Sequence, residues 1–69
     1  MSYYVPQRHY YILHYSYYAH GKTINKTTEV AKIEIKYNKF VVFKNERNHT
    51  VLLNLDNVTV IEEVTEDLW

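Results

Sequence analysis

Three histidines lie close together near the start of the chain, and imidazole is a side chain that binds metals and titrates near neutral pH. They are His9, His14 and His20. On an extended strand His9 and His14 point to opposite faces, while His14 and His20 share a face at a separation of roughly 20 Å. No two of the three can hold one metal ion, and a site would need His49 or a second chain. We therefore expect no metal centre.

Side chains that could act as nucleophiles, acids or bases are few. Ser16 is the one serine beyond the start, and no pattern marks the base and the oxyanion site that it would need. Glu62 and Glu63 are adjacent, so on a strand they face opposite ways and cannot work as a pair. Cysteine is absent, and the single glycine, Gly21, excludes a glycine-rich phosphate loop. The sequence predicts a non-enzymatic protein without a cofactor.

Tyrosine is unusually frequent, with 8 Tyr and 2 Phe in 69 residues. Arg8, Tyr10, His14 and Tyr18 fall on the even-numbered face of one predicted strand and would form an aromatic and basic strip. Such strips stack on bases in sheet-based nucleic-acid binders. Tyr and Arg also carry binding energy in protein interfaces. A third interpretation is that the tyrosines simply pack a small fold with their hydroxyls at its rim.

Charge is unevenly spread along a chain whose net charge is zero. Residues 1–48 hold all 8 Lys and Arg against three Glu, which gives +5, and residues 49–69 hold only acidic charges, which gives −5. Either the halves neutralise each other across the fold, or a basic face remains for an anionic partner or for head-to-tail self-association. Zero net charge argues against strong duplex binding, but the positive half leaves single-stranded DNA or RNA open.

The last residues combine acidic and apolar side chains. Glu66 and Asp67 precede Leu68 and Trp69. Trp69 is either a lid on the chain's own core or an anchor inserted into a neighbour. The basic first half of a second copy would be the natural docking surface for such an anchor.

Short strands are the elements that must position these side chains. Between residues 38 and 64 three apolar runs are separated by polar turns, a pattern typical of an antiparallel meander. We predict strands over residues 8–20, 29–37, 40–45, 50–55 and 58–64. Residues 1–7 form a lead-in, residues 21–28 a loop, residues 38–39 a two-residue turn and residues 65–69 an acidic tail.

Alternation along these strands predicts which face is buried. In residues 8–20 the odd positions are largely apolar and should face the core, and a bulge is expected near Ser16 because the strand is long. In residues 29–37 we expect four side chains to face inward, Ala31, Ile33, Ile35 and Tyr37. Residues 40–45 are apolar on both faces, which indicates a central strand.

The fold class that follows is all-β, a single small domain over residues 1–69. We expect a small antiparallel five-stranded barrel or strongly curved sheet, Sm-like or Src-homology-like in architecture, without substantial helix. A short helical turn near Asp56 would fit such a barrel. A chain this short buries only about 60% of its unfolded surface, so we expect a homo-oligomer or a bound partner.

Two further expectations concern location and origin. No apolar run approaches the ~20 residues of a membrane span and no signal peptide is apparent, so we expect a cytoplasmic protein that does not bind membranes. Residue types with AT-rich codons are frequent, which points to a phage, a plasmid or a low-GC bacterium.

The first functional hypothesis is a small accessory protein that binds another protein and regulates or inhibits it. The alternative is a single-stranded DNA or RNA binding protein that uses the tyrosine-rich strand and the basic residues of the first half. A third class, a ligand-binding or catalytic oligomer, would need a pocket between subunits. The candidate binding residues, for either kind of partner, are Arg8, Tyr10, His14, Tyr18, Lys22, Lys26, Lys44 and Trp69.

Overall fold

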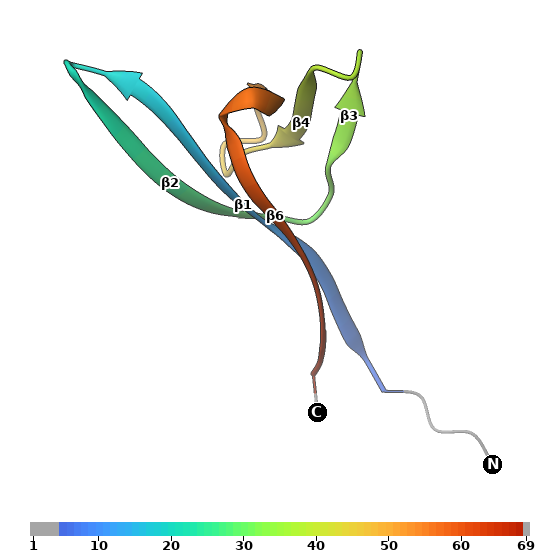
Figure 1. Ribbon diagram of the computed structural model, residues 1–69. Helices are drawn as coiled ribbons and strands as arrows, with labels where there is room; N and C mark the ends of the chain where they lie inside the picture. Colours follow the sequence, from blue (N-terminus) through green and yellow to red (C-terminus); the bar gives the residue numbers. More distant parts are fainter. Residues whose placement is uncertain (1–4, 69) are drawn as a thin grey trace.

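Two three-stranded antiparallel sheets make up the chain in a computed structural model that describes residues 5–68 (Figure 1). In the first sheet the strand order is β2-β1-β6, and in the second it is β3-β4-β5. The strands are β1 (Gln7–Ala19), β2 (Lys22–Val30), β3 (Glu34–Lys36), β4 (Phe40–Lys44), β5 (Thr50–Asn54) and β6 (Val58–Asp67). The prediction of an antiparallel all-β protein is confirmed. Within residues 5–68 there are six strands rather than five, and neither sheet closes into a barrel.

β1 is the central strand of the first sheet. Only its middle part pairs with both neighbouring strands, and each of its ends pairs with one of them. Its first residues, Gln7–Tyr10, pair only with Val64–Asp67 of β6. Its last residues, 16–19, pair only with residues 22–25 of β2. These two segments form a hairpin over residues 16–25. We call the first pair of segments the stalk and the hairpin the arm; they project from opposite ends of the sheet (Figure 1).

The arm occupies much of the segment that was predicted to be a loop, residues 21–28, and that prediction is wrong. His20 and Gly21 have φ of 53° and 78°, and two successive residues with positive φ suit the two-residue turns that match the twist of a hairpin. Thr and Ile are good strand formers, and they recur through β2. The turn therefore reverses the chain immediately, and β2 pairs with β1 along its whole length.

The strand predicted over residues 29–37 is divided between the two sheets. Residues 31–33 form a bend that carries the chain from β2 to β3. Ala31 is exposed as a result, Ile35 is 46% exposed and Tyr37 is 84% exposed, so the predicted inward face is wrong except at Ile33. The turn between β3 and β4 spans residues 37–39, three residues rather than the predicted two, and Tyr37 and Asn38 have φ of 57° and 51°.

The core lies where the odd-numbered face of β1 packs against the second sheet. Leu13 and Val41 are completely inaccessible, and Val30 and Phe43 are also buried. Seven partly buried side chains surround them: Tyr11, Tyr15, Ile33, Val51, Leu53, Leu55 and Val58. Burial of each large side chain contributes about 1.5–3 kcal/mol. The predicted core face of β1 and the central position of the strand over residues 40–45 are confirmed.

The final strand is longer than predicted and includes most of the acidic tail. β6 runs to Asp67, and the backbone N–H of Leu68 donates to the carbonyl of Pro6 at 3.0 Å. The pairing of β1 with β6 shifts register between His14 and Tyr15, close to the bulge expected near Ser16. A 3-10 turn, η1 (Leu55–Asn57), precedes β6 at the position expected for a short helical turn.

The chain has an extended shape and a large surface for its size. Its Cα radius of gyration is 15.0 Å, whereas a compact chain of this length has about 11 Å. Its accessible surface is 5836 Å², about a quarter above the ~4,600 Å² expected for a compact monomer of 8.4 kDa. Stalk and arm account for this shape, because each is a two-stranded ribbon outside the core.

Candidate protein interface

The first sheet has an outer face, which is turned away from the core and carries the even-numbered residues of β1. The register of the three strands places fourteen side chains there. They are Arg8, Tyr10, Ile12, His14, Ser16 and Tyr18 of β1, Thr23, Asn25, Thr27 and Glu29 of β2, and Val60, Glu62, Val64 and Glu66 of β6. We call this surface the outer face. The second sheet packs on the opposite side and leaves it uncovered.

At the stalk end of the outer face, Arg8 is held by two carboxylates. Its guanidinium contacts Glu29 and lies 3.6 Å from a carboxylate oxygen of Glu66. The same guanidinium lies 4.2 Å from the centroid of the Tyr10 ring, in cation–π geometry. The Tyr10 hydroxyl donates to Glu66 at 3.3 Å. Arg8 and Tyr10 are therefore fixed by partners on the neighbouring strands.

The environment of Tyr10 favours its neutral form. Partial removal from water raises the pKa of the Tyr10 hydroxyl above its ordinary value, and the carboxylates of Glu66 and Glu29 raise it further. Arg8 acts in the opposite direction but does not reverse the shift. The phenol therefore stays protonated and remains a donor to Glu66 through the neutral pH range.

In the middle of the outer face, His14 bridges the two outer strands. Its Nε2 lies 2.5 Å from Glu62 on β6, and its Nδ1 lies 3.2 Å from the Thr27 hydroxyl on β2. His9 lies on the opposite face, with Nε2 2.9 Å from Glu63 and its ring edge-on to Tyr11. The histidines are thus separated as the spacing predicts, and residues 5–68 contain no group of three His, Cys, Asp or Glu that could hold a metal.

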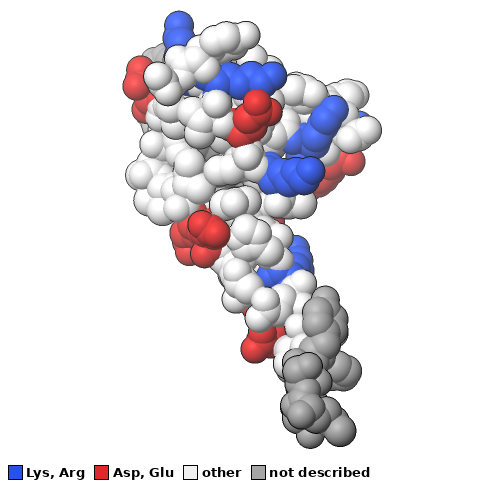
Figure 2. All heavy atoms as spheres, turned by 90° about the vertical axis from the view of Figure 1, so that its right-hand side faces the viewer, with Lys and Arg blue, Asp and Glu red and all other residues white. Residues whose placement is uncertain are grey.

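The outer face is aromatic and acidic. Its charged side chains are Arg8 against Glu29, Glu62 and Glu66, a net charge of −2 with neutral histidine. Tyr18 is 75% exposed, and Val60 is also exposed. Figure 2 shows the uneven charge on one side of the molecule, where most basic side chains lie on the wide part and acidic ones predominate on the narrow part.

The structure divides the predicted binding residues among three places. Arg8, Tyr10, His14 and Tyr18 share the outer face. Lys22 and Lys26 pair with Ala19 and Tyr15, so they lie on the opposite face, Lys22 on the arm and Lys26 at its base. Lys44 belongs to the second sheet. Trp69 lies outside the described residues, so neither the lid nor the anchor is tested.

Sequence reasoning missed the three glutamates that give the outer face its sign. Glu29 comes from β2, the next strand along the chain, whereas Glu62 and Glu66 come from β6, the last strand. Only the order β2-β1-β6 brings them beside Arg8 and His14, and the alternation of side chains along each strand does not specify that order. The strip predicted to be aromatic and basic is therefore aromatic and acidic.

Comparison with known proteins identifies no relative: no family model, no curated protein and no solved structure matches this chain. Among the described residues, no helix has the length and apolar character needed to cross a membrane.

Proposed function

We propose that this chain is a non-enzymatic protein-binding module whose outer face binds a protein surface that carries lysine or arginine. The observation that carries the proposal is the uncovered strip of Tyr10, His14 and Tyr18 beside three glutamates. Tyrosine supplies large contact area at a protein interface, and a complementary charge speeds association and selects the partner.

The preset geometry of the strip supports this proposal. Arg8, Tyr10 and His14 each have a hydrogen-bonding or ionic partner on a neighbouring strand. Side chains that are already fixed lose less conformational freedom on binding, so more of the contact energy appears as affinity. The outer face is part of a continuous sheet rather than a loop, which also favours a defined docking geometry.

Single-stranded DNA or RNA is the second candidate, and the arm is where it would bind. On the outer face three carboxylates oppose phosphate, and two of them already engage Arg8. On the face opposite Tyr18, Tyr17 lies between Lys22 and Lys26 in register, and neither lysine forms an ion pair among residues 5–68. An aromatic ring beside two lysines matches the stacking and charge that single-strand binders use.

We also infer an architecture related to small Sm-like or Src-homology-like barrels and a role as a cytoplasmic accessory protein of a phage, a plasmid or a low-GC bacterium. The bend at residues 31–33 and the 3-10 turn before β6 support the first inference. Residue composition supports the second. Regulation or inhibition of the bound protein, by covering one of its surfaces, is the action we propose.

The test compares retention of proteins from a low-GC bacterial lysate on the immobilised full chain and on three variants. Tyr10→Ala/Tyr18→Ala and Glu62→Lys alter the outer face, whereas Leu52→Ser alters an exposed position on the second sheet. We expect a protein that wild type and Leu52→Ser retain and that the outer-face variants lose at least tenfold. Equal retention by all variants would contradict the proposal.

A parallel titration with a labelled single-stranded oligonucleotide tests the second candidate. Binding that weakens steeply with salt, and that Lys22→Ala/Lys26→Ala abolishes, would favour the arm as a nucleic-acid site. We expect no such binding at physiological salt.

A further inference from the structure

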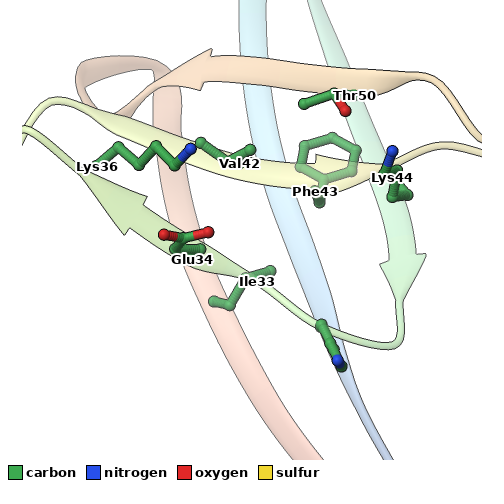
Figure 3. A pocket seen from close by; sticks show the side chains of 8 residues that line it. Ile33, Glu34, Lys36, Val42, Phe43, Lys44 and Thr50 are labelled. Carbon is green, nitrogen blue, oxygen red and sulfur yellow. The ribbon is translucent and has the colours of Figure 1, made fainter.

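A groove opens in the second sheet where β3 departs from β4. β5 pairs with β4 over its full length to Lys44, but β3 pairs only with Phe40–Val42. Opposite Phe43 and Lys44 the chain has already bent toward the first sheet through residues 31–33. The separation leaves a groove of about 510 Å³ between the bend and the end of β4 (Figure 3).

The groove has an apolar floor and a basic rim. Ile33, Val42 and Phe43 contribute the apolar surface. The charged lining residues are Lys32, Lys36 and Lys44 against the single Glu34, a net charge of +2. Figure 3 shows Lys36 and Lys44 at either end of the groove, with Val42 and Phe43 between them.

The rim lysines have no carboxylate partner within the described part of the chain. The ion pairs formed there involve Arg8, His9 and His14, all on the first sheet. Three of the five acidic residues in the second half, Glu62, Glu63 and Glu66, are paired with β1 and do not neutralise this groove. An uncompensated basic rim around an apolar floor suits an extended acidic peptide, with carboxylates against the ammonium groups and an apolar side chain on the floor.

We propose that this groove binds the segment Glu66–Leu68 of a second copy of this chain. The segment has the required chemistry: two acidic residues are followed by Leu68, which is 57% exposed. Asp67 uses its Oδ1 to accept from the Gln7 amide at 2.9 Å, so its other oxygen is available to a lysine.

Distance excludes the same segment of the same chain. β6 starts beside the second sheet and runs ten residues to the end of the stalk, about 33 Å of extended chain. Figure 1 places the end of β6 at the far end of the stalk from β3 and β4. The acidic segment of one copy can therefore reach only the groove of another.

The association is head-to-tail, since each copy contributes one groove and one acidic segment. Such an interface is heterologous and forms either a closed ring or an open chain of copies. The accessible surface of the chain is larger than that of a compact monomer. The excess is greater than the ~800 Å² that each partner buries in an interface of standard size. Of the outer-face residues the segment includes only Glu66, so Tyr10, His14 and Tyr18 stay free, and assembly and retention of a protein partner can be lost separately.

The experiment is light scattering coupled to size-exclusion chromatography of the full chain at low and high salt. We expect an oligomer at low salt that dissociates as salt rises, because exposed charges are screened. A groove variant, Lys32→Gln/Lys44→Gln, and a segment variant, Asp67→Asn/Leu68→Ser, should each be monomeric. Their equimolar mixture should form a 1:1 complex that grows no further, because it retains one intact groove and one intact segment.

Controls separate this site from general charge and from the outer face. Lys22→Gln/Lys26→Gln removes the same charge from the arm and should leave assembly unchanged. Tyr10→Ala/Tyr18→Ala should assemble normally while losing the protein partner. A wild type that is monomeric at low salt, a groove variant that assembles, or a mixture that does not pair would each overturn the inference.

A peptide measurement covers the case in which a variant fails to fold. A labelled peptide of residues 62–68 should bind the segment variant, whose groove is intact, at least tenfold more tightly than it binds the groove variant. Equally tight binding by a peptide with the same residues in scrambled order would overturn the assignment of a second copy as the occupant. Absence of peptide binding by the segment variant would overturn the site itself.

Discussion

The two faces of β1 use the same strand for different purposes. On the face toward the second sheet Leu13 is completely buried, together with Val41 across the core. On the outer face Tyr10, Ile12 and His14 remain accessible, and two of them are held by polar partners instead. The difference shows that one face of the strand is buried in the core, while the other leaves its aromatic and charged groups accessible, as the proposed interface requires. Substitutions on the two faces should therefore separate stability from binding.

The largest expected effect tests the buried face. Leu13→Ala removes a fully buried side chain and should lower the free energy of unfolding by about 3–5 kcal/mol, because the lost burial and the resulting cavity add together. Ile12→Ala, its neighbour on the outer face, should cost less than about 1.5 kcal/mol. Urea denaturation followed by circular dichroism measures both. Equal losses for the two variants would contradict the assignment of faces.

The next effect concerns the arm, where neither face of β1 is covered by the core. Gly21 has φ of 78°, a conformation that costs other residues roughly 1–2 kcal/mol. Gly21→Ala should therefore weaken the arm while leaving the core intact, because no neighbouring atom lies within 4 Å of the added carbon. Hydrogen exchange by NMR should show faster exchange at the backbone amides of residues 16–25 and unchanged exchange at Leu13. Unchanged exchange in the arm would contradict the strain assigned to this turn.

A smaller effect is expected at the centre of the outer face. Glu62→Gln removes the charge that contacts His14, and both side chains are partly exposed, so the loss of stability should be under about 1 kcal/mol. A double-mutant cycle with His14→Ala measures the coupling. Binding of the protein partner should decline more than stability does. A stability loss comparable to that of Leu13→Ala would show that the outer face is part of the core.

The smallest effect follows from the raised pKa of Tyr10. A phenol whose pKa is higher in the folded state favours folding below its unfolded value of 10.0, and this contribution disappears as the pH rises above that value and through the folded pKa. The titration is followed by tyrosinate absorbance. In wild type one hydroxyl should ionise at a higher pH than the others, and this step should be missing in Tyr10→Phe. Glu66→Gln should lower the pKa of this hydroxyl. A Tyr10→Phe titration that differs only in amplitude would contradict the role of the neighbouring carboxylates.

The sequence predictions of secondary structure and burial were accurate where strands pack on the core and wrong where they do not. Alternation identified the odd face of β1, since core burial imposes a period of two. The central strand around Val41 was identified instead because residues 40–45 are apolar on both faces. Alternation did not predict the part of β2 that precedes Glu29, most of which belongs to the arm. Neither face of the arm packs on the core, so no alternation is required there. Alternation failed again at Ile35 and Tyr37, where the chain changes sheets and turns.

The candidate site was predicted in part for a related reason. The even positions of β1 lie together on an uncovered face, as alternation predicts. The glutamates beside them depend on strand order, a long-range property that local patterns do not encode. The groove of the second sheet was also missed, because it arises from the bend at residues 31–33 and brings Lys32 near Lys44.

Retention of a protein partner by wild type and by Tyr10→Ala/Tyr18→Ala tests the central claim most directly. The variant should keep the urea midpoint of wild type within about 0.5 M, since Tyr18 is exposed and Tyr10 lies on the uncovered face. It should lose the partner at least tenfold. A variant that retains the partner as well as wild type does, with its fold intact, would show that the outer face is not the binding surface.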